Sequence, residues 1–365
     1  MWCSIPAHFS PAAAFALLAV RLVAAPPAVS PADLQHVYDE VKTPYKFGIV
    51  LGPAAGEMLD CPSIYRHGNR WFMLYVTIKD KVGYETSLAE STDLLAWKPL
   101  GRVLSHRREG WDAWQAAGGA ALVDHAWGDS ARLQPHDGRF WLSYLGGARQ
   151  GYEPDPLAIG LASTATPDRA TEWTRHPQNP ILAPDQPDAR TFENVTLYKS
   201  TIIRDAKRTL GHPFVMFYNG KSRLAKGSHE AIGLAVSDDL VRWRRLGAGP
   251  VVDHAPGQPA ISGDAQIVSL GSFWVMFYFG HRWKPKAFDT FAVSRDLVHW
   301  TPWEGPHLIE PSEAWDQTFA HKPWVLKHAG VVYHFYCAVG DQGRAIALAT
   351  SKDLRAVPAP AFQHR

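Results

Sequence analysis

Residues 91–97, STDLLAW, follow a run of apolar residues, and the same phrase returns four more times along the chain. The other copies are SDDLVRW at 237–243, SRDLVHW at 294–300, a degenerate copy at 163–173 and a truncated one, SKDL, at 351–354. Successive serines lie 72, 74, 57 and 57 residues apart. A period of this size is typical of the blades of a β-propeller with insertions in its loops.

A pair of apolar strands joined by a polar turn precedes each copy of this phrase. Residues 60–75, DCPSIYRHGNRWFMLY, align without a gap to residues 129–144, DSARLQPHDGRFWLSY. Similar hairpins end at Tyr218, Tyr278 and Tyr336. Alternating bulky β-formers around glycine-containing turns favour antiparallel hairpins. Five copies therefore predict an all-β fold, a five-bladed β-propeller.

The fifth repeat lacks an outer strand. In the earlier copies the tryptophan of the phrase opens a further strand, whereas the fifth copy runs out of residues near Pro358. A closed ring of blades has no free edge, so we expect Tyr45–Leu51, YKFGIVL, to supply the missing strand and close the last blade. Residues 31–365 are thus predicted to form one domain.

Composition and charge narrow the classes of protein. Of the 365 residues, 46% are hydrophobic and 20% are charged, which excludes wholesale disorder and a coiled coil. A formal net charge of +2 gives no electrostatic footprint for nucleic acid or an anionic membrane. Three cysteines exclude a disulfide framework.

Residues 1–30 hold an apolar run, 12–20, followed by Arg21 and the small residues Ala24 and Ala25. This pattern indicates a weak signal peptide and hence a periplasmic or secreted protein. The alternative is a disordered N-terminal extension on a cytoplasmic protein. No stretch of the sequence is long and apolar enough to span a bilayer.

Acidic residues mark the expected hub of the propeller. The innermost strand of every blade starts near the central channel, so equivalent positions of the repeats converge in space. The aligned repeats place there Asp60, Asp129, Glu193, Asp264 and His321. Burying several carboxylates together is costly unless they serve a function, so this set predicts a catalytic site. The aspartates of the repeated phrase are instead interpreted as turn caps.

Short motifs at these positions resemble those of known enzymes. Asp60-Cys-Pro-Ser-Ile64 is similar to the first-blade motif of the five-bladed glycoside hydrolases of family 43 and relatives such as families 117 and 130. The stretch 193–199, ENVTLYK, resembles their third-blade motif, and Asp129 falls where their second-blade aspartate belongs. The resemblance covers roughly residues 45–355, and it implies cleavage of glycosidic bonds in plant or microbial polysaccharides.

The resemblance also implies roles for these groups. Asp60 is expected to be the general base that activates water, Glu193 the general acid, and Asp129 the group that raises the pKa of the acid. An inverting, exo-acting glycosidase follows. His321 is an alternative proton donor, or a ligand for a central water or a structural Ca²⁺; no other metal or cofactor is expected.

Aromatic and basic side chains near the inner strands are candidates for binding the carbohydrate. Sugar rings stack on aromatic faces, and their hydroxyl groups need polar partners. The candidate substrate-binding residues are Trp111, Trp114, Arg132, Lys199, His281, Trp283, Trp324 and Arg344.

Two other functions stay open. A glycoside phosphorylase, similar to family 130, needs a basic cluster for phosphate, for which Lys199, His281 and Arg282 are candidates. A non-catalytic carbohydrate-binding propeller is favoured if the hub acids are exposed and far apart. Phosphate-dependent turnover of chromogenic glycosides discriminates among these functions. The sequence does not identify the sugar, the linkage or the oligomeric state.

Overall fold

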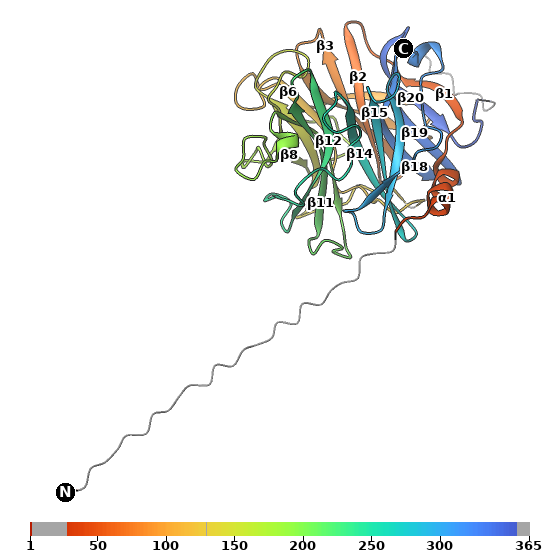
Figure 1. Cartoon of the computed structure of the whole chain (residues 1–365). Coiled ribbons are helices and arrows are strands. Elements are labelled where there is room, and N and C mark those ends of the chain that lie inside the picture. The colour runs from red at the N-terminus through yellow and green to blue at the C-terminus, as the bar shows by residue number, and fades with distance from the viewer. Residues whose placement is uncertain (2–27, 129, 356–365) are drawn as a thin grey trace.

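The computed structural model describes residues 1, 28–128 and 130–355, and its regular structure is nearly all β-strand (Figure 1). Within these residues one α-helix, α1 (Pro31–Val41), and two 3₁₀ turns, η1 (Thr191–Glu193) and η2 (Ala314–Asp316), accompany the strands. No helix of the described part is long and apolar enough to cross a membrane. The all-β prediction is therefore confirmed.

The strands form three hydrogen-bonded sheets. The first holds β2 (Glu57–His67), β3 (Arg70–Lys79), β4 (Tyr84–Ser91), β5 (Lys98–Leu104), β6 (Gln115–Ala120), β7 (Phe140–Gly147), β8 (Ala158–Thr164) and β9 (Thr174–Arg175). The second holds β10 (Thr196–Arg204), β11 (Phe214–Arg223), β12 (Ser228–Ser237), β13 (Arg244–Arg245), β14 (Ile261–Leu270), β15 (Phe273–His281), β16 (Phe288–Ser294) and β17 (Trp300–Pro302). The third holds β18 (Phe319–His328), β19 (Val331–Gly340), β20 (Gly343–Thr350) and β1 (Tyr45–Leu51).

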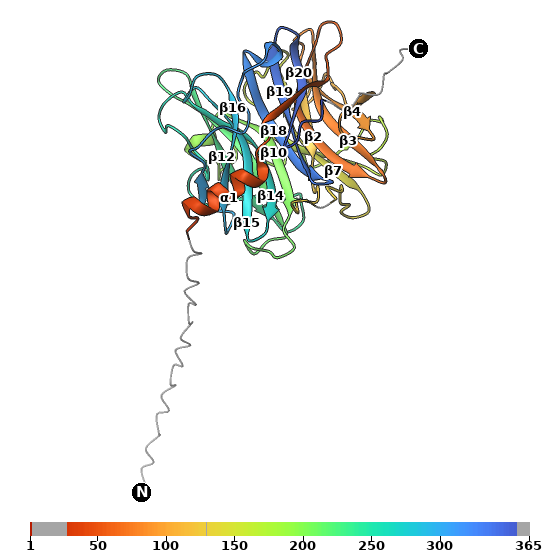
Figure 2. The same ribbon diagram turned by 90° about the vertical axis from the view of Figure 1, so that its right-hand side faces the viewer.

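Each eight-stranded sheet consists of two antiparallel four-stranded groups. Among the described strands, the strand pairing that links the groups of the first sheet is the single parallel pair Tyr84–Gln115, and in the second sheet it is Glu230–Ile261. In the third sheet β1 runs antiparallel to β20, so the prediction that Tyr45–Leu51 supplies a strand there is confirmed. Strand β2 contacts β18, β19 and β20, which places the first sheet against the third (Figure 2).

The three complete copies of the repeated phrase form the same turn, one in the first sheet and two in the second. Leu94, Leu240 and Leu297 adopt left-handed φ angles of 67°, 70° and 68°. In each copy the tryptophan Nε1 donates a hydrogen bond to the carbonyl oxygen of that leucine, at 3.2, 2.7 and 3.0 Å. The aspartate carboxylate accepts backbone N–H groups two and three residues further on. The interpretation of these aspartates as turn caps is confirmed.

The hydrophobic core lies between neighbouring four-stranded groups, which explains why the middle strands are apolar on both faces. Strand β3, for example, is buried from Trp71 to Ile78. Helix α1 covers the outside next to β14 and β15 (Figure 2), where Val37 and Val41 pack against Phe277. A capping box at Ser30 begins this helix.

The pairing of strands corrects the alignment of two repeats. The strand that pairs with β7 is β6, not the segment that begins at residue 129, because residues 121–139 are an insertion between these strands. The second-repeat equivalent of Asp60 is therefore Ala117, opposite Leu145. Asp129 itself lies outside the described residues. In the third repeat, Leu197 rather than Glu193 corresponds to Asp60, since Glu193 ends a 3₁₀ turn before β10.

Candidate active site

Four inner strands carry a β-bulge at the same place. The bulged pairs are Cys61–Pro62 in β2, Tyr198–Lys199 in β10, Asp264–Ala265 in β14 and Lys322–Pro323 in β18. Three of these residues, Cys61, Asp264 and Lys322, have left-handed φ angles of 47°, 54° and 64°. A bulge changes the direction of its side chains, and strained backbone of this kind is typical of functional sites.

These bulges surround a cavity of about 240 Å³. The charged and polar groups that the inner strands and β20 bring together there are Asp60, Lys199, Asp264, His321, Lys322 and Arg344. All of these except Arg344 are buried, and Arg344 is half-buried. Of the predicted catalytic residues, the cavity thus unites Asp60, Asp264 and His321, while His281 also lines it as expected.

Asp60 is an ionised anchor in the wall of this cavity. Its Oδ1 accepts the N–H of Cys61 at 2.9 Å, and its Oδ2 accepts hydrogen bonds from Lys322 Nζ at 2.8 Å and Arg344 at 2.5 Å. Burial opposes its ionisation, but the cations Arg344 and Lys322 outweigh burial and hold the pKa of Asp60 well below its usual value. A carboxylate stabilised in this way is a weak base, so the geometry disfavours the predicted role of Asp60 as general base.

His321 lies beside Asp60 as a neutral imidazole. Burial lowers the pKa of His321 well below its usual value, and the cations Arg344 and Lys322 lower it further. Its Nδ1 lies 3.1 Å from the carbonyl oxygen of Cys337, which fixes the proton on Nδ1. Nε2 is then an acceptor, which disfavours the predicted role of His321 as an alternative proton donor.

The predicted calcium site does not suit the groups near His321. Asp60, His321 and Cys337 offer ligand atoms within 4.8 Å of one another. Calcium takes six to eight oxygen ligands, whereas this set supplies one carboxylate, an imidazole and a thiol. The carboxylate is already bound to two cations. These three residues therefore do not fit Ca²⁺.

Two glutamates that the sequence analysis missed also line the cavity, Glu153 and Glu230. Glu153 follows β7, in a loop next to Tyr152, whose hydroxyl accepts a hydrogen bond from Arg344 at 2.8 Å. Glu230 lies near the start of β12, paired with Lys221 across the sheet. Burial raises the pKa of Glu230 to about 8, and the nearby carboxylate of Glu153 contributes to the shift. Glu230 is therefore protonated at neutral pH and ready to donate its proton.

A signal for Glu230 exists in the sequence. Seven positions before the serine of the phrase, four of the five copies carry a residue that lines the cavity, and only Pro156 of the degenerate copy does not: Tyr84, Glu230, Ala287 and Arg344. Counting from this serine, rather than from the hairpins, finds the third-strand positions that face the hub. Glu153 lies in a loop that has no counterpart in the other repeats, so no such signal marks it.

Glu193, the predicted general acid, does not line the cavity. Its fully buried carboxylate forms an ion pair with Arg245 at 2.6 Å and accepts the hydroxyl of Tyr218 at 2.5 Å. It also accepts the N–H of Arg190 at 3.0 Å, which caps η1. This acid is saturated by fixed partners and is held away from the cavity, so its geometry is that of a structural residue.

The predicted tryptophans pack inside or between the sheets instead of lining the cavity. Trp111 lies over Gly146, where a Cβ atom would come within 2.4 Å of its ring. Trp283 stacks on His254 with ring centroids 4.0 Å apart, and Trp114 lies 5.5 Å from the ring of His106. Trp324 is buried in the core.

Arg132, the remaining predicted substrate-binding residue outside the cavity, pairs through its backbone with Arg66 and Asp124. Lys199 and Arg344 line the cavity as predicted. The aromatic rings there belong to smaller side chains than the sequence analysis singled out: Tyr84, Tyr152, Tyr198, Phe279 and Phe319.

Comparison with known proteins gives two similar solved structures, although no protein-family profile matches the chain. A structure described as an RGII complex of BT0996 is 45% identical, covers 92% of this chain and 100% of its own, and has a TM-score of 0.86. A second, named "Glycoside hydrolase", is 44% identical with the same coverage and TM-score.

More distant proteins share the fold. A thermostable family-43 glycoside hydrolase is 15% identical and covers 89% of this chain and 100% of its own, with a TM-score of 0.58. Among curated proteins, the uncharacterized protein Rv1502 of Mycobacterium tuberculosis is 26% identical over 270 residues, which are 71% of this chain and 81% of that protein.

Proposed function

The chain belongs to the glycoside hydrolases, and from this premise we propose that it is an exo-acting glycosidase in which Glu230 is the general acid and Glu153 its partner carboxylate. Glycoside cleavage needs one protonated carboxylic acid for the leaving oxygen and one carboxylate on the other side of the sugar ring. Glu230 and Glu153 form no ion pair with a described residue, whereas the other acids of the cavity do: Asp60 pairs with Lys322 and Arg344, and Asp264 pairs with Lys199 at 3.8 Å.

The observation that carries this proposal is that Glu230 and Glu153 both line the cavity without an ion pair to a described residue, and the raised pKa of Glu230 supports it. Burial and the charge of Glu153 raise that pKa to about 8, so the proton is present at neutral pH. A general acid is most effective when its pKa lies near the working pH. Asp60 has the opposite environment, since Lys322 and Arg344 hold it ionised. We propose that Asp60 holds Lys322 and Arg344 in place beneath the sugar.

We also propose that the chain folds into a five-bladed β-propeller. The four-stranded groups β2–β5, β6–β9, β10–β13 and β14–β17, together with β18–β20 and β1, would be its blades. Equivalent positions of these groups line one cavity, which supports a ring. Residues 31–365 would form this one catalytic domain, and the preceding residues, most of which lie outside the described part, would direct export.

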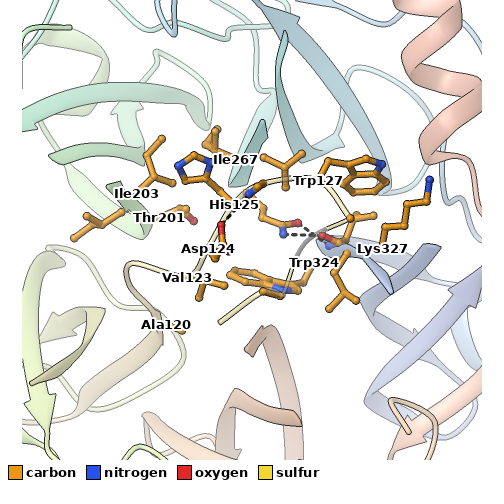
Figure 3. Close-up of a pocket in the computed structure, with 18 residues that line it drawn as sticks. Ala120, Val123, Asp124, His125, Trp127, Thr201, Ile203, Ile267, Trp324 and Lys327 are labelled. Atoms are coloured by element: carbon orange, nitrogen blue, oxygen red, sulfur yellow. Dashed lines mark hydrogen bonds between the residues drawn. The ribbon is translucent and has the colours of Figure 1, made fainter. Parts of the chain in front are cut away.

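Exo action is supported by the far end of the inner strands. There the strands meet around a smaller cavity of about 40 Å³, between Thr201, Trp324 and Lys327 (Figure 3). Residues 122–128 and 130–133 cross this end, where Leu122, Trp127 and Leu133 donate backbone hydrogen bonds to β10, β14 and β2. A chain that enters the active-site cavity would therefore meet a closed end, which suits removal of terminal sugars.

The proposed substrate is a plant or microbial oligosaccharide. The similar structure of BT0996 is described as a complex with RGII, which makes an RGII oligosaccharide the first substrate to test. A purely carbohydrate-binding role is disfavoured because the hub acids Asp60 and Asp264 are buried and close together: Cys61 follows Asp60, and its Sγ donates to Asp264 at 3.4 Å.

The test is hydrolysis of a panel of 4-nitrophenyl glycosides and of RGII oligosaccharides, each with and without inorganic phosphate. The proposal predicts turnover that does not require phosphate and that releases single sugars. Turnover only with phosphate would identify a phosphorylase. Binding without any turnover would identify a carbohydrate-binding protein. The predicted inversion is checked by NMR of the anomer formed first.

A further inference from the structure

Lys199 is a buried cation that lacks a hydrogen-bond acceptor. It occupies the bulge of β10, lines the active-site cavity and is 8% exposed. Among the residues that the structure describes, no group accepts a hydrogen bond from its Nζ. Its ion-pair partner, Asp264 Oδ2, lies 3.8 Å away, which is beyond hydrogen-bond distance.

A second lysine of the cavity, Lys322, has the hydrogen-bond acceptor that Lys199 lacks among the described residues. Lys322 occupies the equivalent bulge of β18, and its Nζ donates to Asp60 at 2.8 Å. Both lysines face the same cavity, but Lys322 is satisfied by the protein, whereas Lys199 has no acceptor among the described residues. A buried ammonium without an acceptor lowers stability, and such a group is retained where a ligand supplies the acceptor.

Asp264 is held in place to complete this pair. Its backbone N–H donates to Asn219 Oδ1 at 2.9 Å, and Asn219 Nδ2 lies 3.4 Å from Asp264 Oδ1. Its Oδ2 receives the thiol of Cys61 at 3.4 Å, which is a weak donor. Oδ2 therefore retains capacity to accept a stronger hydrogen bond on the side of Lys199.

A hydroxyl group has the bonding capacity that these two atoms call for, one acceptor and one donor. Its oxygen accepts a hydrogen bond from Lys199 Nζ while its proton is donated to Asp264 Oδ2, and a separation of 3.8 Å allows both contacts at once. A carboxylate or phosphate in this place would lie against the Asp264 carboxylate and would be repelled. The pair thus selects a neutral group.

We infer that Lys199 and Asp264 clamp one hydroxyl group of a neutral sugar, so that the enzyme rejects substrates that lack this hydroxyl or carry a carboxylate there. This inference rests on the proposed function, because it names the sugar position that the glycosidase recognises. A site built to bond a hydroxyl rejects the analogue without it by large factors, since its buried polar groups are then left unpaired.

The experiment combines a variant with substrate deoxygenation. The 4-nitrophenyl glycoside that the wild type hydrolyses best is compared with each of its monodeoxy analogues, for the wild type and for Lys199→Met. For one position, the wild type should lose at least about 100-fold in kcat/KM on deoxygenation. Lys199→Met should hydrolyse that analogue and the parent glycoside within about fivefold of each other. Asp264→Asn should likewise hydrolyse the parent glycoside and the analogue deoxygenated at that position within about fivefold of each other.

Controls separate the possible outcomes. Lys207→Met replaces an exposed lysine and should keep the wild-type selectivity. The melting temperature of Lys199→Met should be equal to or above that of the wild type; if this variant fails to fold, Lys199→Gln replaces it in the series. Equal losses for the wild type and the variant at every position would overturn the clamp, as would inhibition by inorganic phosphate that depends on Lys199. Absence of hydrolysis by the wild type would instead reject the proposed function.

Discussion

The two ends of the inner strands use the same backbone for opposite purposes. At the cavity end, β10 presents Lys199 and β14 presents Asp264. Two residues further along, Thr201 Oγ1 donates to Ala265, and the amide of Gln266 both donates to and accepts from the backbone of Val325 (Figure 3). The bulges Tyr198–Lys199 and Asp264–Ala265 change the direction of the side chains between these two ends, and regular strand pairing resumes at Ser200 and Gln266.

The difference separates the residues that stabilise the fold from the residues that serve the reaction. At the closed end the polar side chains Thr201 and Gln266 are bonded to backbone groups and hold neighbouring four-stranded groups together. At the cavity end, Lys199 Nζ has no hydrogen-bond acceptor among the described residues, and Glu230 keeps a proton because its pKa is raised. Substitutions at the closed end should therefore change the free energy of unfolding, and substitutions at the cavity end should change turnover.

The largest effect is expected at the cavity end. Glu153→Gln removes the proposed partner carboxylate and should lower kcat/KM by about 10²–10⁴-fold, because a catalytic group of this kind contributes about that much. Thermal unfolding should be unchanged. Glu109→Gln, an exposed substitution, is the control and should leave both quantities as in the wild type. Wild-type turnover by Glu153→Gln would remove this residue from the mechanism.

The substitution Glu193→Gln tests whether Glu193 serves stability or turnover. Glu193→Gln leaves the buried guanidinium of Arg245 with one anionic partner fewer, so the free energy of unfolding in urea should fall by about 3 kcal/mol. Turnover per folded molecule should change little. Loss of turnover with full stability would instead restore the role of general acid that the sequence motif implies.

At the closed end, Gln266→Leu should destabilise the protein more mildly. The N–H and the carbonyl group of Val325 lose their partners, which should cost about 1–3 kcal/mol in the free energy of unfolding. Glycoside turnover should remain at the wild-type level when measured well below the melting temperature. A drop in turnover without a loss of stability would show that this end takes part in the reaction.

The smallest effect concerns pH. Turnover should fall above about pH 8 as Glu230 loses its proton. Lys221 favours the ionised form of Glu230, so Lys221→Met should raise the pKa of this acid and move the alkaline limb of kcat/KM upward by less than about one pH unit. A limb that moves downward, or does not move, would contradict the assignment of this limb to Glu230.

Sequence reasoning succeeded where the signal is local. The Ser-x-Asp-Leu phrase encodes one turn through contacts within seven residues, and it located the strands on either side. The hub positions depend instead on which strands pair, and two features misled the alignment. The insertion 121–139 separates β6 from β7, and η1 places Glu193 before the inner strand.

The roles of the acids could not be read from sequence for a different reason. Burial raises the pKa of both acids; Arg344 and Lys322, from strands late in the chain, reverse the shift for Asp60, whereas Glu153, from a loop, adds to it for Glu230. These five side chains lie close together because the three sheets pack against one another. The local motif therefore suggested Asp60 as a base, and the cations that disfavour this role come from distant parts of the chain.

The most direct test of the central assignment is the dependence of kcat/KM on the leaving group for the wild type and Glu230→Gln. Both are measured on a series of aryl glycosides that differ in the pKa of the phenol. If Glu230 is the general acid, the variant should lose most activity with poor leaving groups and little with 2,4-dinitrophenyl glycosides, which need no proton. An equal loss across the series, or no loss, would contradict the assignment of Glu230 as the acid.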